Sequence, residues 1–360
     1  MRLAGREYRS VWREADGAIR IFDQTKLPWQ VEILRLTEAG QVAEAIRTMR
    51  VRGAPLIGAV AAFGLALALC TDAADATMEA AARLLGATRP TAVNLHWALE
   101  RMLSQLRPAP PDSRADLAAR IAQAIADDDV ETNRRIGRHT LPLLAAHAGK
   151  GRVNVLTHCN AGWLATVDYG TALSGIFQAH DAGIPVHVWV DETRPRNQGA
   201  LLTAFELGGH GVAHTVIADN AGGHLMQRGM VDLCIVGTDR VARNGDVANK
   251  IGTYLKALAA QDNAVPFHVA CPHSTIDWQI DSGAAIPIEE RAAAEVTGMA
   301  GRAHDGSVLQ LRVAAPESPA ANPAFDVTPA RLVSSLITER GTTPASAEGL
   351  FALYPERRAG

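Results

Sequence analysis

The sequence has few cysteines and little net charge. Its 360 residues include four cysteines, and their wide separation lacks the spacing of a metal or disulfide framework. We therefore expect no metal site and a reducing, cytoplasmic setting. Cys70, Cys234 and Cys271 lie in apolar runs, which predicts that they pack in the core. The net charge of −3, without a long basic block, argues against a general nucleic-acid surface.

Long hydrophobic runs and nucleotide-binding glycine motifs are also missing. The most apolar stretch, residues 59–70, is too short to cross a bilayer, and the amino-terminal residues lack the apolar core of a signal peptide. We therefore expect a soluble cytoplasmic protein that binds no membrane. The first predicted strand is not followed by Gly-x-Gly-x-x-Gly, which argues against a dinucleotide cofactor.

The length suggests two domains, the first of which combines a small β element with helices. Alternating residues on both sides of Asp16-Gly17 predict a β-hairpin. A long helix is expected over residues 112–146, with the acidic run 127–129 on a solvated face. Residues 1–148 are therefore expected to form an amino-terminal β-hairpin and helical domain.

Residues 149–360 alternate between strand and helix patterns. Strands are predicted at 153–156, 186–190, 214–218, 233–236, 267–270 and 307–313, and helices around 164–182, 198–208, 221–229, 248–261 and 329–339. This order predicts an α/β protein whose second domain, 149–360, is a Rossmann-like, doubly wound parallel sheet. Ligands bind such sheets at the carboxyl ends of the strands.

Reactive side chains follow several of these predicted strands. Cys159 lies in a Thr-His-Cys-Asn-Ala-Gly turn after the first strand, where it is either a group that takes part in the chemistry or a small buried hydrophobe. A carboxylate after a strand is often a helix cap, but Asp239 lies several residues before the next predicted helix. We expect Cys159, Gln198, Asp239 and Lys250 to meet at one edge of the sheet. His158 is expected to be structural.

The helix predicted after Gly53 begins with features of an anion site. Glycine permits close approach of a ligand, and the free N–H groups of Gly53 and Ala54 would carry partial positive charge beside Arg52. The alternative is a plain loop-to-helix junction with a surface arginine. Arg89 is either solvated or a second anion ligand. Lys250 is expected to open a helix, where an anion nearby would offset the unfavourable helix dipole. These features indicate metal-free acid–base chemistry on a small phosphorylated substrate.

Several motifs, in the same order along nearly the whole chain, resemble the methylthioribose-1-phosphate isomerase family, which is related to the regulatory subunits of the translation-initiation guanine-exchange factor. They are Arg52-Gly53-Ala54-Pro55, Thr88-Arg89-Pro90-Thr91, Thr157-His158-Cys159-Asn160-Ala161-Gly162, Glu192-Thr193-Arg194-Pro195-Arg196-Asn197-Gln198-Gly199, Gly237-Thr238-Asp239-Arg240 and Asn249-Lys250-Ile251-Gly252-Thr253. The resemblance implies a homodimeric aldose–ketose isomerase of methionine salvage that uses no cofactor. Its reaction, an intramolecular oxidation and reduction, converts 5-methylthioribose 1-phosphate into 5-methylthioribulose 1-phosphate.

The resemblance also implies roles for individual residues. Asp239 matches the catalytic acid/base and Cys159 the residue that assists the transition state. The positions that match substrate-binding residues are Arg52, Gly53, Ala54, Arg89, Gln198, Asn249 and Lys250. Trp163 departs from the small residue more usual in the family and is expected to reshape the site near the sugar's 5-substituent. Three alternatives stay open: isomerisation of 5-deoxyribose 1-phosphate, isomerisation of ribose 1,5-bisphosphate, and a non-catalytic regulatory subunit of the same fold.

Overall fold

The amino-terminal region is a small antiparallel sheet beside a bundle of helices. This computed structural model describes residues 2–3 and 5–358. Within that part of the chain, β1 (Arg2–Leu3) pairs with β2 (Arg6–Glu7), and a three-stranded sheet has the order β3 (Val11–Arg13), β4 (Ile19–Phe22), β5 (Ile33–Leu36). Asp16-Gly17 lies between β3 and β4, which pair antiparallel, and this confirms the predicted hairpin.

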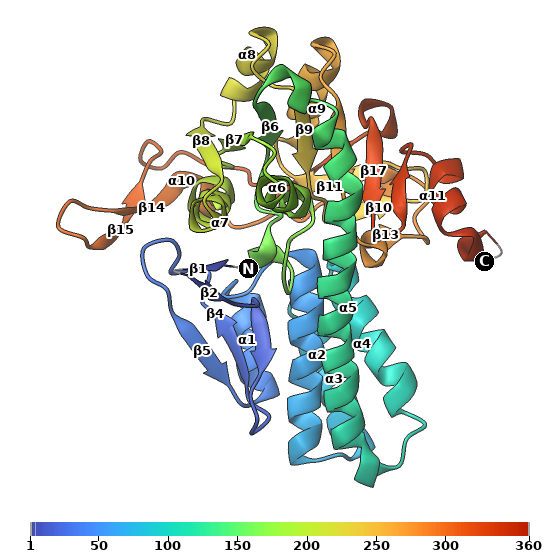
Figure 1. Cartoon of the computed structure of the whole chain (residues 1–360). Helices are drawn as coiled ribbons and strands as arrows, with labels where there is room; N and C mark the ends of the chain where they lie inside the picture. Colours follow the sequence, from blue (N-terminus) through green and yellow to red (C-terminus); the bar gives the residue numbers. More distant parts are fainter. Residues whose placement is uncertain (1, 4, 359–360) are drawn as a thin grey trace.

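The helices of the bundle extend below the larger sheet (Figure 1). They are α1 (Ala39–Arg47), α2 (Ala54–Thr71), α3 (Asp75–Gly86), α4 (Val93–Leu106) and α5 (Pro111–Ala145). Because α2 is apolar on all sides, it is buried among α1, α3, α4 and α5. Among the residues described, α2 is the one helix that by length and composition alone could cross a membrane, and 72% of it is buried in the protein. Cys70, on its last turn, is exposed, so its predicted place in the core is wrong.

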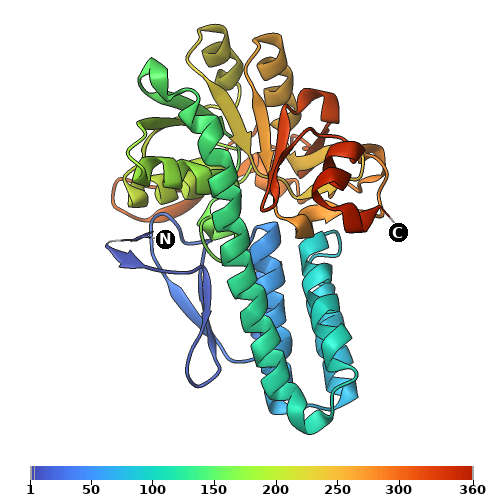
Figure 2. The same ribbon diagram turned by 45° about the vertical axis from the view of Figure 1, so that its right-hand side comes forward.

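Helix α5 connects the bundle to the larger sheet (Figure 2). It packs against α2 and, further along, against α6 (Ala172–Asp181), where Ser174 Oγ donates a hydrogen bond to the Asn133 carbonyl oxygen. The prediction that residues 127–129 form a solvated face holds for Asp127 and Asp128 only. Asp129 Oδ2 accepts a hydrogen bond from the Val167 N–H at 2.7 Å, and burial raises its pKa to about 7. The division into domains 1–148 and 149–360 stays a prediction.

The larger sheet is the predicted doubly wound sheet. In the described residues its order is β18-β17-β12-β9-β6-β7-β8, parallel except for β18. The strands are β6 (Val153–Thr157), β7 (Val186–Asp191), β8 (Ala213–Ile217), β9 (Leu233–Val236), β12 (Phe267–Ala270), β17 (Ser335–Thr338) and β18 (Gly341–Thr343). The strands predicted from β6 to β12 are confirmed. Residues 329–339 form no long helix: they contain the short turn η6 (Ala330–Leu332) and then β17, whose side chains are all buried.

Helices and short turns precede, connect and follow these strands. They are η1 (Ala148–Lys150), η2 (Trp163–Ala165), α6, η3 (Gly199–Thr203), α7 (Ala204–His210), α8 (Ala221–Gln227), α9 (Thr253–Asp262), η4 (His273–Thr275), α11 (Ala347–Leu353) and η7 (Pro355–Arg357). The helix predicted over 164–182 forms only in its second half. The first half is η2 and an irregular loop.

A second, smaller sheet lies beside the carboxyl ends of the main strands. Its order is β13 (Ile276–Asp277), β10 (Arg240–Ala242), β11 (Val247–Lys250) and β16 (Phe325–Thr328). The sequence patterns did not predict it, and β11 occupies the start of the helix expected over 248–261. After η5 (Gly283–Ala285) and α10 (Ala294–Thr297), β14 (Gly298–Arg302) and β15 (Val308–Arg312) form a hairpin that projects from the molecule (Figure 1). β15 confirms the strand predicted at 307–313.

Candidate active site

The topological switch of the main sheet lies between β6 and β9. The chain enters the sheet at β6, continues outward through β7 and β8, and returns on the other side of β6 as β9. Cys159 follows β6 and Asp239 follows β9, so both lie at the crevice where open α/β sheets bind ligands. A cavity there is lined by these two residues together with Arg52, Gly53 and Asn249.

Adjoining cavities are lined by Ala54, Arg89 and Gln198, whereas Lys250 is not among the described residues that line them. Asp239 and Ala54 also line a second cavity, where Arg89 forms part of the wall. Arg52 lines a third cavity of about 380 Å³, which Gln198 borders. The structure therefore gathers side chains from the amino-terminal helices and from four strand ends at one edge of the sheet.

Cys159 lies in a tightly held turn. Its φ is +66°, a left-handed conformation that residues other than glycine rarely adopt. The Cys159 N–H donates a hydrogen bond to Thr193 Oγ1 at 2.9 Å, and Thr203 Oγ1 donates one to the Cys159 carbonyl oxygen at 2.7 Å. Only 8% of the cysteine is exposed. Strained backbone of this kind persists where surrounding contacts hold it and is frequent at functional sites.

Cationic side chains surround the thiol and the acid. Burial raises the pKa of the Cys159 thiol and of the Asp239 carboxyl, and in both cases Arg52 and Lys250 act in the opposite direction. The negative charge of Asp239 further raises the pKa of Cys159, so the two groups share one electrostatic environment. The site therefore favours a protonated acid beside a thiol, within a cavity whose positive charge suits a phosphate.

The expectation that Lys250 opens a helix is wrong. Residues 247–250 form β11, which pairs with β16, and α9 begins only after a further turn. Lys250 is buried, its Nζ donates a hydrogen bond to the Ala324 carbonyl oxygen at 2.9 Å, and it lies 4.6 Å from the centre of the Phe325 ring. Burial lowers the pKa of this ammonium, while the acidic groups of the site oppose that shift.

The start of α2 has the conformation predicted for an anion site. Gly53 is the N-cap with a φ of +96°, and Pro55 occupies the first turn. A Cβ on Gly53 would lie 2.4 Å from the Ala165 Cα. Packing against the loop after β6 therefore requires glycine at this position, in addition to any requirement set by a ligand. Because Gly53 and Ala54 line the cavities on both sides of Asp239, the positive end of the helix borders the site.

Arg52 and Arg89 each form a bond to another side chain of this protein. Arg52 Nη1 donates to Asn160 Oδ1 at 2.6 Å, and its Nη2 donates to the Asn160 carbonyl oxygen at 2.9 Å. Arg89 forms an ion pair with Glu289 at 3.2 Å and is 16% exposed at its side chain. Arg52 is therefore held against the turn that carries Cys159, which excludes the alternative of a free surface arginine.

Two amide side chains, of Gln198 and Asn249, also line the cavities of the site. Gln198 is buried, and its Oε1 has no hydrogen-bond partner within residues 2–3 and 5–358. A buried amide oxygen of this kind requires a partner, which a sugar hydroxyl could supply. Asn249 lines the cavity with Cys159 and donates from Nδ2 to Thr253 Oγ1 at 3.0 Å, so its side chain is fixed in place.

Sequence comparisons identify the relatives of this chain. Residues 50–345 match the model of the Initiation factor 2 subunit family. The chain is 64% identical to the methylthioribose-1-phosphate isomerase of Methylobacterium nodulans, over 99% of each protein. The chain belongs to this isomerase family. The methylthioribose-1-phosphate isomerase of Acidiphilium cryptum is also 64% identical, over 99% of this chain and 98% of that protein.

Solved structures show the same relationship. The crystal structure of 5-methylthioribose 1-phosphate isomerase from Pyrococcus horikoshii has a TM-score of 0.86 and 41% identity, over 98% of this chain and 97% of that one. The crystal structure of the translation initiation factor eIF-2B, subunit delta, from A. fulgidus has a TM-score of 0.81 and 38% identity, over 97% of this chain and all of that one. The fold is thus shared by isomerases of the family and by a protein named as an initiation-factor subunit.

Trp163, the position that departs from the family pattern, lies in the core. Its indole is 1% exposed and packs edge-on against Phe22, with ring centres 5.5 Å apart. It is absent from the described residues that line the cavities around Cys159. The expectation that it reshapes the sugar site is therefore wrong, because the side chain points toward the amino-terminal sheet.

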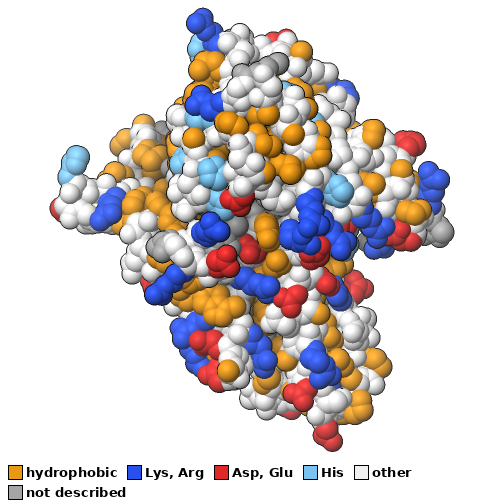
Figure 3. Space-filling view, in the orientation of Figure 1, with side chains coloured by type: hydrophobic (Ala, Val, Ile, Leu, Met, Phe, Trp, Pro, Cys, Tyr) orange, Lys and Arg blue, Asp and Glu red, His pale blue; other side chains and the backbone are white. Residues whose placement is uncertain are grey.

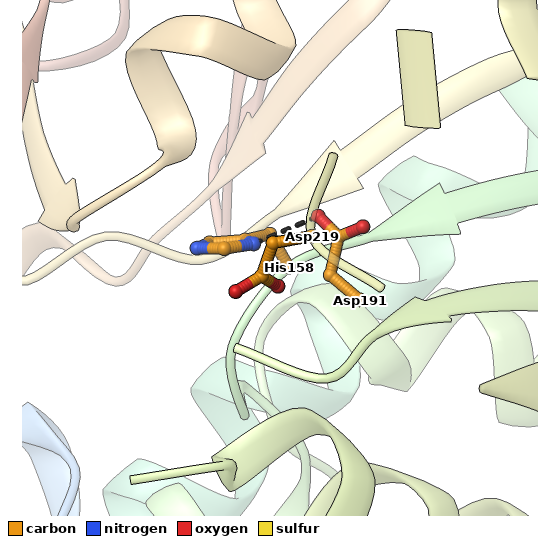
Figure 4. Close-up of side chains that lie close together, drawn as sticks. All are labelled: His158, Asp191 and Asp219. Atoms are coloured by element: carbon orange, nitrogen blue, oxygen red, sulfur yellow. Dashed lines mark hydrogen bonds and ion pairs between the residues drawn. The ribbon is translucent and has the colours of Figure 1, made fainter. Parts of the chain in front are cut away.

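His158, Asp191 and Asp219 form a group next to the turn (Figure 4). Their ligand atoms lie within 4.8 Å of one another, a spacing that could hold a metal ion. However, Lys256 Nζ lies 3.1 Å from Asp191 Oδ2 and donates a hydrogen bond to the Asp219 carbonyl oxygen. His158 Nδ1 lies 2.8 Å from Asp191 Oδ2, and its Nε2 lies 2.8 Å from the Ile251 carbonyl oxygen. This lysine already supplies the positive charge, so the donor set fits a structural cluster better than a metal centre.

Sequence reasoning missed the residues that hold the Cys159 turn. Thr193 and Thr203 bond its backbone, and Glu206 bonds the Asn160 side chain. Threonines in loops and helices carry no signal for such a role. The one available sign is that Glu206 interrupts an apolar pair, Phe205 and Leu207, within a predicted helix.

Proposed function

We propose that the protein converts 5-methylthioribose 1-phosphate into 5-methylthioribulose 1-phosphate, an aldose–ketose isomerisation of methionine salvage. The observation that carries this proposal is that Cys159 and Asp239 line one cavity, beside Arg52 and the start of α2. A thiol, a carboxyl group and an anion-binding helix end are suited to acid–base chemistry on a sugar phosphate. The printed names of relatives at 64% identity support the same substrate.

In the proposed first step the sugar ring opens. The substrate is a furanose closed by its 1-phosphate, so it has no free aldehyde. Asp239 donates a proton to the ring oxygen while the phosphate lies against Arg52 and the Gly53-Ala54 helix start. The raised pKa of Asp239 supports this role, because only the protonated carboxyl can donate.

In the second step hydrogen moves from C2 to C1, and the C2 hydroxyl becomes a ketone as it loses its proton. The hydrogen moves either as a proton through a cis-enediol, with Cys159 or Asp239 as base, or as a hydride in a dry pocket, with the carboxylate and the thiol stabilising the charge. Isomerisation in heavy water separates the routes. Deuterium at C1 of the product supports the proton route, and complete retention of the original hydrogen supports the hydride route.

The third cavity supports a neutral 5-substituent. Its wall includes Trp29, Met49 and Leu202, which suit a methylthio group. Arg196 also borders it, but Glu295 Oε1 lies 2.8 Å from Arg196 Nη1 and compensates that charge. Arg52 is the other described cation that lines this cavity, and in the proposed reaction it binds the 1-phosphate, so a second phosphate would lack a free cationic partner among the described residues there.

A competition experiment tests this proposal. The purified protein is given equal concentrations of 5-methylthioribose 1-phosphate, 5-deoxyribose 1-phosphate and ribose 1,5-bisphosphate, and each ketose product is followed by phosphorus NMR. We expect the first substrate to be consumed fastest and the bisphosphate slowest. Faster conversion of the bisphosphate would exclude the proposed specificity. Absence of any ketose would instead support a regulatory subunit, as the 38% identity to the eIF-2B delta subunit allows.

Three further features of the proposal concern the protein as a whole. We propose that it acts in the cytoplasm as a homodimer, that it needs no cofactor, and that residues 1–148 and 149–360 are its two domains. The surface supports the expectation that it binds no nucleic acid, because on the face shown in Figure 3 acidic side chains are interspersed with basic ones over the lower half of the molecule.

A further inference from the structure

The segment from Gln198 to Glu206 contacts the site at several points. Gln198 borders the third cavity, and Gly199–Thr203 form a π-helical turn that continues into α7. Turns of this kind are rare and are frequently found at functional sites. Thr203 bonds the Cys159 carbonyl oxygen, and one turn later the side chain of Glu206 reaches the same loop.

Glu206 is a buried carboxylate surrounded by hydrogen-bond donors. It is 2% exposed. Its Oε1 accepts hydrogen bonds from Asn160 Nδ2 at 2.8 Å and from the Leu164 N–H at 3.2 Å, and its Oε2 accepts one from the Trp163 N–H at 2.7 Å. A Cβ on Gly162 would lie 1.8 Å from Glu206 Oε2, so only glycine at this position of the loop leaves room for the carboxylate. Both oxygens therefore act as acceptors at once.

Asn160 connects this carboxylate to Arg52. A carboxylate can only accept hydrogen bonds and a guanidinium can only donate them, so the amide has one orientation that satisfies both: Nδ2 toward Glu206 and Oδ1 toward Arg52. The Asn160 carbonyl oxygen accepts a second bond from Arg52. Asn160 Nδ2 also donates to Thr203 Oγ1, at 3.2 Å, so Glu206 forms the shorter of the two bonds that fix the amide. The orientation of the Arg52 guanidinium therefore depends in part on which group Glu206 presents to Asn160.

We propose that Glu206 is a positioning residue of the isomerase, which acts through Asn160 to hold Arg52 against the phosphate of the substrate. Arg52 lines the same cavity as Cys159 and Asp239, whereas Glu206 lies behind the turn and does not line it. The charge of Arg52 in turn opposes the effect of burial on Glu206, whose pKa is raised to about 7. This inference rests on the proposed function, because it needs a phosphorylated substrate.

The substitution Glu206→Gln tests the connection. A glutamine keeps the shape but turns one acceptor into a donor, which must face either Asn160 or the Trp163 N–H. We expect KM for 5-methylthioribose 1-phosphate to rise by about tenfold, the effect of losing one charge-assisted hydrogen bond. In an Arg52→Ala background the same substitution should change KM less than about twofold, because the residue it acts through is gone.

A second variant separates loss of the proposed connection from misfolding. Asn160→Ala removes the connection but leaves Glu206 bonded to the Trp163 and Leu164 N–H groups, so the loop keeps its support. It should raise KM as Glu206→Gln does, and its effect should also vanish with Arg52→Ala. Asp246→Asn is the matched control, because Asp246 also accepts hydrogen bonds from two backbone N–H groups, at 2.8 and 2.9 Å, outside the cavities.

The outcomes separate this inference from the proposed function. An unchanged KM in a folded Glu206→Gln or Asn160→Ala variant overturns the inference, and so does an equal rise of KM with and without Arg52. A rise of KM in Asp246→Asn of the same size would show a general loss of stability and also overturns it. If the unsubstituted protein fails to isomerise the sugar phosphate, the proposed function itself has failed.

Discussion

Replacing Asp239 by asparagine removes the proposed proton donor with little change in shape. The carboxyl lies at the end of β9, lines two adjoining cavities and has a raised pKa because it is buried. An amide cannot transfer a proton to the ring oxygen. General acid catalysis contributes about two to four orders of magnitude in rate, or about 3–5 kcal/mol of transition-state stabilisation. We therefore expect kcat of Asp239→Asn to fall at least about a hundredfold.

The assay follows ketose formation over a range of pH, and calorimetry of product binding shows whether the site is intact. In the unsubstituted protein kcat should fall as pH rises through the raised pKa of Asp239, because the ionised form has no proton to donate. That decrease should disappear in the variant, while the affinity for product stays within about threefold, since the phosphate contacts remain. A variant with near-normal kcat and an unchanged pH profile would refute the role of Asp239.

Three other substitutions test separate parts of the account. Arg52→Ala should raise KM more than it lowers kcat, measured by steady-state kinetics, because phosphate is held in ground and transition states alike. Trp163→Ala should lower the free energy of unfolding by about 3–5 kcal/mol without changing the preference among sugar phosphates, since the indole packs on Phe22 in the core. Asp129 has a pKa raised to about 7, so its contribution to stability is present at low pH and is lost as pH rises toward that value. The free energy of unfolding of Asp129→Asn, measured in urea, should therefore rise relative to that of the unsubstituted protein between about pH 4 and pH 8, by up to about 4 kcal/mol. A difference between the two proteins that stays constant over this pH range would contradict this.

The main sheet could be predicted because its central strands are short apolar runs that end in polar turns. β6 and β9 are examples, and the polar residues after them included Cys159 and Asp239. In contrast, Leu332, Val333, Leu336 and Ile337 have the spacing of a helix face, yet pairing with β12 makes the second half of that segment a strand. Local spacing cannot anticipate such a partner, because the partner comes from a distant part of the chain.

The same limit explains which parts of the site were missed. Lys250 was assigned to a helix because β11 is defined only by its pairing with β10 and β16, where Asn249 lies opposite Asp326. Trp163 was expected near the sugar because it follows the Cys159 turn, but its indole packs against Phe22 of the amino-terminal sheet. Glu206 and Asn160 meet only after the fold has formed. Single residues at strand ends were thus predictable, and the contacts that orient them were not.

A crystal structure with bound 5-methylthioribulose 1-phosphate tests the central claim most directly. We predict that its phosphate lies against Arg52 and the Gly53-Ala54 start of α2, with C1 and C2 between the Cys159 sulfur and the Asp239 carboxyl. A product whose phosphate binds away from that helix start, or whose C1 and C2 touch neither Cys159 nor Asp239, would contradict the account.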